Sequence, residues 1–155
     1  LVTDTMSKRC PIAVNEKPLV CISYELGPNL KTRGEIEAAI CQGMSQFELE
    51  YMGRGPKEIR CHLIEDILIV RLKGVLTAAE QHLVAKLPSE KGRDLLKQVR
   101  SQLIEIARPT LEELVEGITG IKPASLHHDI STVSGEEIVV FTMLEAPEFR
   151  ETKKQ

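Results

Sequence analysis

Two strand-like segments joined by a short polar turn constrain the fold of this chain more than any other feature. In "KEIRCHLIED", residues 57–66, apolar and polar side chains alternate. The next segment, "DILIVRLKG", is apolar on both faces until the alternation resumes at Arg71 and Lys73. Glu65 and Asp66 between them suit a tight turn. This pattern predicts an antiparallel hairpin.

A second pair of strand-like segments lies near the end of the chain. "IKPASLHHDISTV" and "EEIVVFTML" are joined at Ser134 and Gly135, which favour a turn. Alternation predicts two faces for the first of these segments: Ala124, Leu126, His128 and Ile130 on one, and Ser125, His127, Asp129 and Ser131 on the other. A second hairpin with one buried and one wetter face is therefore expected.

Helical periodicity occupies the stretches before and between the hairpins. Residues 32–51 carry an apolar stripe, with Glu48 among the carboxylates expected on the solvent side, and Thr32 with Glu35 fits a capping box. Thr77 with Glu80 predicts a second capped helix, which Pro88 ends. A long helix from Ser89 to Gly120 should kink at Pro109. Its predicted apolar stripe is Leu95, Leu96, Val99, Leu103, Ile106, Leu111, Leu114 and Ile118.

The order helix, hairpin, two helices, hairpin predicts an α+β fold: a mainly antiparallel sheet of about four strands, with the helices on one face. We assign residues 31–145 to this domain and 146–155 to a frayed polar tail. Residues 1–30 form an N-terminal arm, for which an adherent segment with a strand at 18–26 and a disordered segment fit equally well.

Composition narrows the setting of the protein. The 155 residues suit one domain, and a net charge of -3 disfavours a general nucleic-acid coat. The sequence lacks an apolar run of about 20 residues and the plan of a secretory signal, so we expect a cytoplasmic protein without membrane insertion. The four cysteines are widely spaced, which favours idle or buried thiols over a disulfide or a zinc site.

The glycine-rich corner Gly53–Lys57 is the first candidate site. Arg54 and Lys57 follow a predicted helix end, where cations are favoured by the helix dipole. Alternatively, backbone donors at Gly55 together with Arg54, Lys57 and Arg60 bind a carboxylate, bicarbonate or phosphate. The spacing differs from that of a phosphate-binding loop, and the glycines follow a helix instead of preceding one.

A second cationic group lies on the first hairpin. Arg71 and Lys73 share one side of their strand, and Arg60 and His62 lie on the neighbouring strand. Ordinary pairing with carboxylates on a solvated face accounts for this pattern. The alternative is a patch that meets an acidic partner or a second subunit.

His127 and Asp129 are weak candidates for a metal site. They share a strand face, whereas His127 and His128 point to opposite faces. A third ligand would have to come from His62 or Glu136. We therefore expect no metal and no cofactor, with His128 packed and hydrogen-bonded. No serine or cysteine lies in a recognised nucleophile motif, so an enzyme is not expected.

The long helix also bears on assembly. Leu96, Val99, Leu103 and Ile106 are spaced 3, 4 and 3, as in a heptad seam. Covering the sheet would explain this seam, but Leu95 and Ile104 broaden the apolar surface. The surplus favours an isologous homodimer.

Three blocks carry a family resemblance: "GRGPKEIR", "RLKGVLTAAE" and "HDISTVSGEEIVVFT", in this order around a long charged helix. Together they resemble the MpsC domain family, over roughly residues 32–145. The positions that match its pattern are Gly53, Arg54, Gly55, Pro56, Arg71, Lys73, Gly74, Thr77, His128, Asp129, Ser131, Thr132 and Gly135. The resemblance implies a small bacterial protein that accompanies the membrane components of a potential-generating system linked to cation and inorganic-carbon uptake.

Three functions stay open from the sequence. The resemblance favours a non-enzymatic accessory or regulatory protein that works with a membrane transporter component. The element order also resembles one arrangement of the RNA-binding KH domain, although residues 88–92 hold one glycine where that domain has a GxxG loop. The third hypothesis is a sensor of a small anion or metal that uses Arg54 with His127 and Asp129.

Overall fold

The computed structural model describes residues 30–151 and arranges them as three helices and one four-stranded sheet. This is the α+β fold that the sequence predicts. The expected arm, including its candidate strand at 18–26, lies outside the described residues apart from Leu30. Cys10 and Cys21 lie outside them as well.

Helix α1, Arg33–Tyr51, begins at the predicted capping box. The Thr32 hydroxyl accepts from the Glu35 N–H at 3.3 Å, and Glu35 Oε2 accepts from the Thr32 N–H at 2.6 Å. At the other end Gly53 adopts a φ of 83°, a left-handed conformation that suits glycine. Local chemistry therefore fixes both ends of α1, as the sequence predicts.

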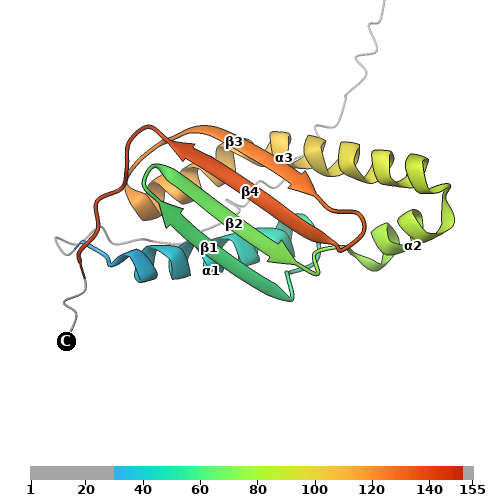
Figure 1. Cartoon of the computed structure of the whole chain (residues 1–155), viewed down its shortest axis with the longest axis horizontal. Helices are drawn as coiled ribbons and strands as arrows, with labels where there is room; N and C mark the ends of the chain where they lie inside the picture. Colours follow the sequence, from blue (N-terminus) through green and yellow to red (C-terminus); the bar gives the residue numbers. More distant parts are fainter. Residues whose placement is uncertain (1–29, 152–155) are drawn as a thin grey trace, which may run out of the picture.

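The sheet consists of strands β1 (Glu58–Ile64), β2 (Ile67–Lys73), β3 (Pro123–Ile130) and β4 (Glu136–Met143). Its spatial order is β1-β2-β4-β3, and every neighbouring pair is antiparallel (Figure 1). The two predicted hairpins are confirmed, and they join through β2 and β4. Strands β1 and β3 are consequently the edges of the sheet.

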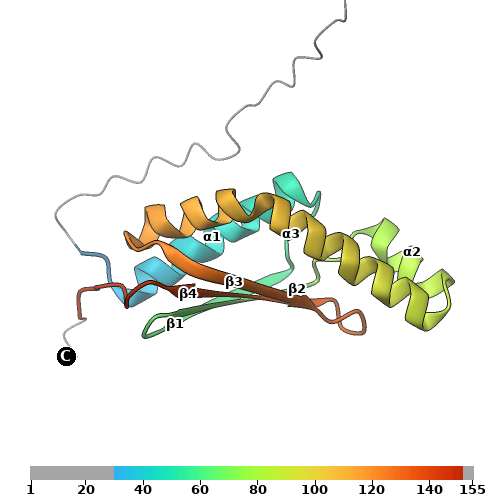
Figure 2. The same ribbon diagram turned by 90° about the horizontal axis from the view of Figure 1, so that it is seen from above.

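Helices α1 and α3 lie on one face of the sheet, α2 lies beside α3 past the end of the sheet, and the described residues leave the other face of the sheet uncovered (Figure 2). Helix α1 packs on β1, and the long helix α3, Ser89–Thr119, packs on β3 and α1. Helix α2, Ala78–Lys86, packs mainly on α3. Helix α3 continues through Pro109 without a break.

The core fills the layer between the helices and the sheet. Its fully buried side chains include Ile40 and Met44 of α1, Leu68 and Leu72 of β2, Leu111 and Val115 of α3, and Val139 and Phe141 of β4. Burial of each such side chain favours folding by about 1.5–3 kcal/mol. Close approach of α1 to α3 occurs at Gly43, where an added Cβ would lie 2.6 Å from Leu114 Cδ1.

The predicted apolar stripe of α3 is partly wrong. Leu95, Val99 and Ile106 are 42%, 45% and 70% exposed. The buried stripe lies one position along the helix and contains Gly92, Leu96, Arg100, Ile104, Ala107, Leu111, Leu114, Val115 and Ile118. A charged residue can occupy this stripe because Arg100 binds carboxylates inside the fold, as described below.

Two smaller expectations also differ from the structure. Ala124 is exposed, because the β3–β4 register shifts between Pro123 and Ser125 before the predicted alternation resumes at Leu126. Part of the expected frayed tail packs on the domain. The Arg150 N–H donates to the Lys31 carbonyl at 2.9 Å, and Phe149 packs against the core.

The described cysteines are free thiols. Cys61 is buried on β1 and Cys41 is half-buried on α1. Burial raises the pKa of both thiols, so both are less reactive than an exposed cysteine.

Candidate functional site

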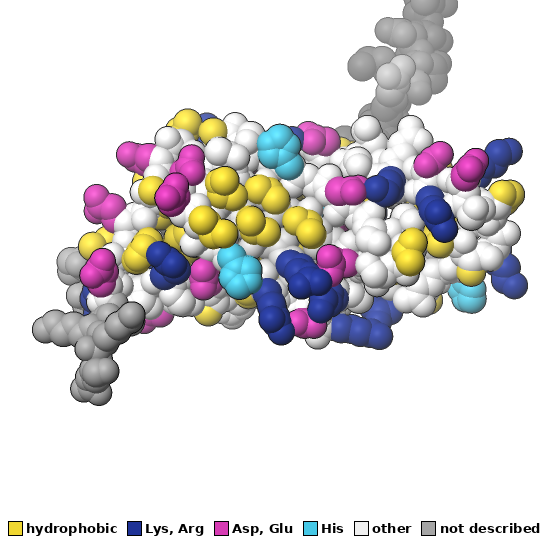
Figure 3. Space-filling view, viewed as in Figure 1, with side chains coloured by type: hydrophobic (Ala, Val, Ile, Leu, Met, Phe, Trp, Pro, Cys, Tyr) yellow, Lys and Arg dark blue, Asp and Glu magenta, His cyan; other side chains and the backbone are white. Residues whose placement is uncertain are grey.

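The uncovered face of the sheet is the first candidate surface. Because side chains alternate along each strand, residues out of phase with the core point away from the helices. Ile64, Ile67 and Ile138 on this face are 56%, 38% and 38% exposed. Figure 3 shows an aliphatic cluster in the middle of the face, with a histidine on either side and cations at one end. An exposed apolar cluster of this kind is typical of an interaction surface.

The predicted cationic patch lies at one end of this open face. Arg60 pairs with Arg71 across the β1–β2 ladder, and Lys73 lies two residues further along β2. Each cation has a carboxylate partner: Arg60 lies 2.8 Å and Lys73 lies 3.2 Å from Glu58, and Arg71 lies 2.5 Å from Glu136. The structure therefore brings these predicted site residues together, and local pairing reduces their net charge.

The Gly53–Lys57 corner connects α1 to β1. The Arg54 N–H donates to the Glu48 carbonyl at 3.2 Å, and the Lys57 N–H donates to the Lys73 carbonyl at 2.8 Å. Within residues 30–151 the side chains of Arg54 and Lys57 take part in no ion pair. Gly55 is half-buried in the corner. Chain reversal accounts for the backbone contacts, and anion binding by the two cations stays a prediction.

His127 and Asp129 share the open face, as predicted, but their partners do not suit a metal. Asp129 binds the Lys97 ammonium through both oxygens, at 2.8 and 3.1 Å, and that hydrogen bond holds the pKa of Asp129 below its usual value. His127 Nε2 lies 3.4 Å from Ser125 Oγ. His62 is three strands away, about 14 Å. The part of the chain that the structure describes contains no group of three metal-binding side chains.

A depression of about 360 Å³ lies beside strand β3 and the β3–β4 turn. The Lys97–Asp129 pair and the β3–β4 turn residues Ser131, Thr132 and Val133 line it. Ser131 stabilises the turn, because its backbone N–H donates to the Glu136 carbonyl at 2.7 Å and its Oγ accepts from the Ser134 N–H at 3.3 Å. Ser131 therefore organises the backbone of the β3–β4 turn.

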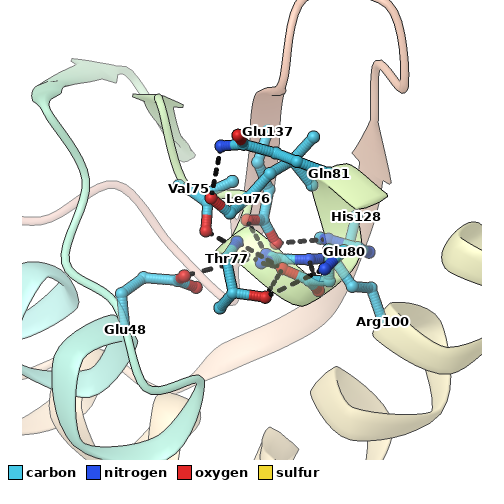
Figure 4. A network of polar contacts seen from close by, with 9 residues as sticks. All are labelled: Glu48, Val75, Leu76, Thr77, Glu80, Gln81, Arg100, His128 and Glu137. Carbon is cyan, nitrogen blue, oxygen red and sulfur yellow. Dashed lines mark hydrogen bonds and ion pairs between the residues drawn. The ribbon is translucent and has the colours of Figure 1, made fainter. Parts of the chain in front are cut away.

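A buried ionic network lies on the opposite side of the sheet, under the helices. Arg100 of α3 has no exposed side-chain surface and is its centre (Figure 4). Arg100 donates to Glu80 Oε1 at 2.8 Å and Oε2 at 3.0 Å, to Glu137 Oε2 at 2.8 Å, and to the Val75 carbonyl at 3.1 Å. One side chain thus joins α3, the start of α2, the β2–α2 connection and β4.

Glu80 has two roles in this network. It closes the predicted capping box with Thr77, whose N–H donates to Glu80 Oε2 at 2.7 Å, and it binds Arg100. Burial alone would raise the pKa of Glu80, but the hydrogen bonds from Arg100 and Thr77 outweigh it and lower the pKa. Glu80 is therefore ionised at neutral pH and stabilises the Arg100 charge.

Glu137 extends the network to the edge strand. Its Oε1 lies 2.5 Å from His128 Nε2 on β3. A carboxylate only accepts hydrogen bonds, so His128 Nε2 carries the hydrogen. His128 Nδ1 is buried without a hydrogen-bond partner. The predicted packing and hydrogen bonding of His128 are confirmed.

Glu48 of α1 completes the network and is its least satisfied member. It is 1% exposed, its Oε2 has no hydrogen-bond partner among residues 30–151, and the nearest guanidinium nitrogen of Arg100 lies 3.7 Å away. Burial, together with the negative charges of Glu137 and Glu80, raises the pKa of Glu48 to about 8, against the opposing effect of Arg100. Glu48 therefore holds a proton at neutral pH.

The region that matches known proteins has nearly the same boundaries as the fold. A family model described as "Na+-translocating membrane potential-generating system (MpsC)" matches residues 32–145, from the cap of α1 to just past β4. The chain belongs to the MpsC family. The uncharacterised protein YbcI of Bacillus subtilis (strain 168) is 37% identical to it over 113 residues, which cover 73% of this chain and 89% of YbcI. No solved structure matches the chain.

Two features of the MpsC domain bear on the functions left open above. Across the described residues, each helix falls short of the length or the apolar character that crossing a bilayer requires. The α2–α3 junction, where a KH domain has its GxxG loop, holds Gly92 buried in the first turn of α3, with the Leu83 carbonyl 3.1 Å from an added Cβ. This glycine is therefore not presented to a nucleic-acid backbone.

Sequence reasoning named Glu80 only as a cap and missed the network as a unit. A signal was present, because Arg100 lies four residues from both Leu96 and Ile104, in phase with the buried stripe. Likewise, Glu48 follows Met44 by four residues, and Glu137 alternates in phase with Val139. Charged residues at such positions indicate mutual pairing inside the fold.

Proposed function

We propose that this MpsC chain is a non-catalytic accessory or regulatory protein that associates with a membrane cation or inorganic-carbon transport system. The family's description as a Na+-translocating system that generates a membrane potential supports this setting. The role within that setting is inferred from the surfaces of the domain.

The observation that carries the proposal is that the domain exposes two separate apolar surfaces. One is the open sheet face around Ile64, Ile67 and Ile138. The other is the outer stripe of α3, formed by Leu95, Val99 and Ile106. Apolar surface gains about 25 cal/mol per Å² when it leaves water. Two such surfaces on a small domain favour a role in which it binds other protein surfaces.

The polar groups gathered by the fold support the same role. Arg100 directs its donors to Glu80, Glu137 and the Val75 carbonyl, all within the core. These contacts hold α2, α3 and β4 against one another. The network therefore shapes the surfaces of the domain and does not point its charges at a bound substrate.

The test combines gene deletion with variants of the α3 stripe. Deletion should reduce the Na+-dependent membrane potential, measured with a voltage-sensitive dye in inverted vesicles, or reduce bicarbonate uptake by cells. The wild-type gene should restore the signal, and Val99→Glu or Ile106→Glu should not. Gln102→Glu, an equal charge change at an exposed position of the same helix, is the matched control and should restore it. A deletion strain with unchanged potential and unchanged bicarbonate uptake across salt and carbon conditions would refute the proposal.

The Gly53–Lys57 corner offers a second candidate function, because it carries two cations, Arg54 and Lys57, without ion pairs among the described residues. A small-anion sensor would use them to bind bicarbonate or phosphate. Calorimetric titration of the protein with bicarbonate and with phosphate tests this function. Binding that Arg54→Ala abolishes and Arg93→Ala retains would support it, and absence of heat up to millimolar anion would exclude it.

A further inference from the structure

The open sheet face is ordered in rows across the strands. The ladder registers place three side chains of this face at the first level and four at each of the next three. From the cationic end, the rows read Glu58, Lys73, Glu136; then Arg60, Arg71, Ile138, Asp129; then His62, Ile69, Val140, His127; then Ile64, Ile67, Thr142, Ser125. The third row has aliphatic residues on β2 and β4 and a histidine on each edge strand, whereas the second row has Ile138 on β4 between Arg71 and Asp129.

Charge on this face is divided between its two halves. The β1–β2 half carries Arg60, Arg71 and Lys73 against a single carboxylate, Glu58. The β4–β3 half carries the carboxylates of Glu136 and Asp129; Lys97, which reaches Asp129 from α3, offsets one of them. One half is therefore net positive and the other net negative, and Arg71 of the first half binds Glu136 of the second.

We infer that the open face binds a second copy of this chain, face to face, about a two-fold axis parallel to the strands between β2 and β4. Such an axis exchanges the two halves of the face and keeps each row at its own level. Arg60 of one copy then opposes Asp129 of the other, and Lys73 opposes Glu136. Both contacts occur twice, as an isologous interface requires.

The same axis brings aliphatic residues together in the third row and places Arg71 against Ile138 in the second. Ile69 opposes Val140 at the centre, and Ile67 lies against Thr142. Sheets that pack in this way lie about 10 Å apart with strands about 30° from parallel. The alignment is therefore best at the axis, where the aliphatic side chains lie, and looser at the charged edges.

The alternative in-plane axis, perpendicular to the strands, gives a poor match. It inverts the rows, so each strand meets its own copy. Lys73 would then oppose Ile67, and Arg60 would oppose His62. Charged groups would lose water without gaining a counter-charge, which disfavours this arrangement. The charge pattern of the face thus selects one axis.

The size of the face sets the expected affinity. Four strands of about seven residues cover roughly 19 Å by 23 Å. This footprint is at the small end of specific interfaces, which bury about 800 Å² of accessible surface on each partner. The dimer should therefore dissociate in the micromolar range. The heptad-like seam of α3 is not needed for this dimer, and the inference stands independently of the transport role.

The decisive experiment uses two charge-reversal variants and their mixture. Sedimentation equilibrium of the full chain at 5–200 μM should show a monomer–dimer equilibrium. Arg60→Glu places like charges at both Arg60–Asp129 contacts of its own dimer, and so does Asp129→Arg. Each variant alone should raise the dimer Kd on the order of tenfold or more. Arg93→Glu, at an exposed α3 position away from the sheet, is the matched control and should keep the wild-type Kd.

Mixing the two variants separates this geometry from any other dimer. In a heterodimer of an Arg60→Glu copy and an Asp129→Arg copy, both contacts regain opposite charges, so dimer should reappear. Far-UV circular dichroism of each variant verifies that it is folded. A wild-type chain that stays monomeric at 200 μM overturns the inference and leaves the face to a different partner. Variants that dimerise like wild type, or a mixture that stays monomeric, overturn it too.

Discussion

Glu48 provides the sharpest test of the buried network, because its proton is bound only in the folded state near neutral pH. Its pKa is about 8 in the fold and 4.5 in the reference state without burial. Between these values the folded protein holds a proton that the unfolded chain releases. The free energy of unfolding must therefore fall as pH rises through this window.

The magnitude follows from the two pKa values. The contribution of Glu48 is fully present below about pH 4.5 and is lost as pH rises through about 8. Within the window the slope is about 1.4 kcal/mol per pH unit. Between pH 6.5 and pH 8.5 the free energy of unfolding should drop by about 2 kcal/mol because of this one group. For a domain of this size that loss lowers Tm by roughly 6–10 °C.

The substitution Glu48→Gln isolates the effect. The amide has nearly the shape of the protonated carboxyl and does not titrate, so the drop of about 2 kcal/mol should disappear. Urea unfolding is followed by circular dichroism, since the chain has no Trp. Glu50→Gln, an exposed glutamate of the same helix, is the control and should keep the wild-type pH dependence. Parallel pH profiles for wild type and Glu48→Gln would refute the reasoning.

Three further predictions concern the core. Arg100→Met leaves the carboxylates of the network without their counter-charge, so the free energy of unfolding measured in urea at pH 7 should fall by about 3–5 kcal/mol. This loss should shrink toward pH 5, because the carboxylates then protonate. Gly43→Ala should lower the free energy of unfolding by about 1–3 kcal/mol, because its Cβ would lie 2.6 Å from Leu114. Gly34→Ala, whose Cβ would meet nothing within 4 Å, should raise it by up to about 1 kcal/mol. Thermal melts of the two variants compare these effects. Cys61 should resist iodoacetamide at pH 8 in the native protein and react in urea, as peptide mapping will show, because burial raises its pKa.

The elements of the fold were predictable because their signals are local. Thr32 with Glu35 and Thr77 with Glu80 are capping boxes three residues apart, and both form as expected. Gly53 takes the left-handed conformation that ends a helix. Such signals depend on the chain immediately around them, so tertiary packing does not overturn them.

The side chains that hold the elements together were not predictable in the same way. Periodicity alone assigns a charged residue to solvent, and it placed Glu48 outside the core and overlooked Arg100. Each is buried because the other elements supply its partners: Glu80 from α2 and Glu137 from β4 pair with Arg100. Periodicity can mark these charged positions as in phase with apolar residues, but the partners are distant in sequence, so which charges pair becomes visible only when the elements are assembled.

The outer stripe of α3 shows the same limit for apolar residues. Leu95 and Leu96 are adjacent in sequence, yet Leu96 is 1% exposed and Leu95 is 42% exposed. Two apolar stripes run side by side along the helix, and their composition does not reveal which one meets the sheet. Arg100 lies in the stripe that is buried, because its carboxylate partners are inside the fold.

Strand alternation places the proposed dimer surface and the buried network that contains Glu48 on opposite faces of the sheet. On β3 and β4, His128 and Glu137 point into the network, whereas the adjacent His127 and Ile138 point to the open face. Substitutions on one face should therefore leave the other unaffected. Arg60→Glu should weaken the dimer and keep the wild-type fall in stability between pH 6.5 and pH 8.5, measured on the monomer at low concentration. Glu48→Gln should abolish that fall and keep the wild-type dimer Kd. A variant that changed both quantities would show that the two faces are coupled through the sheet, contrary to the independence that strand alternation predicts.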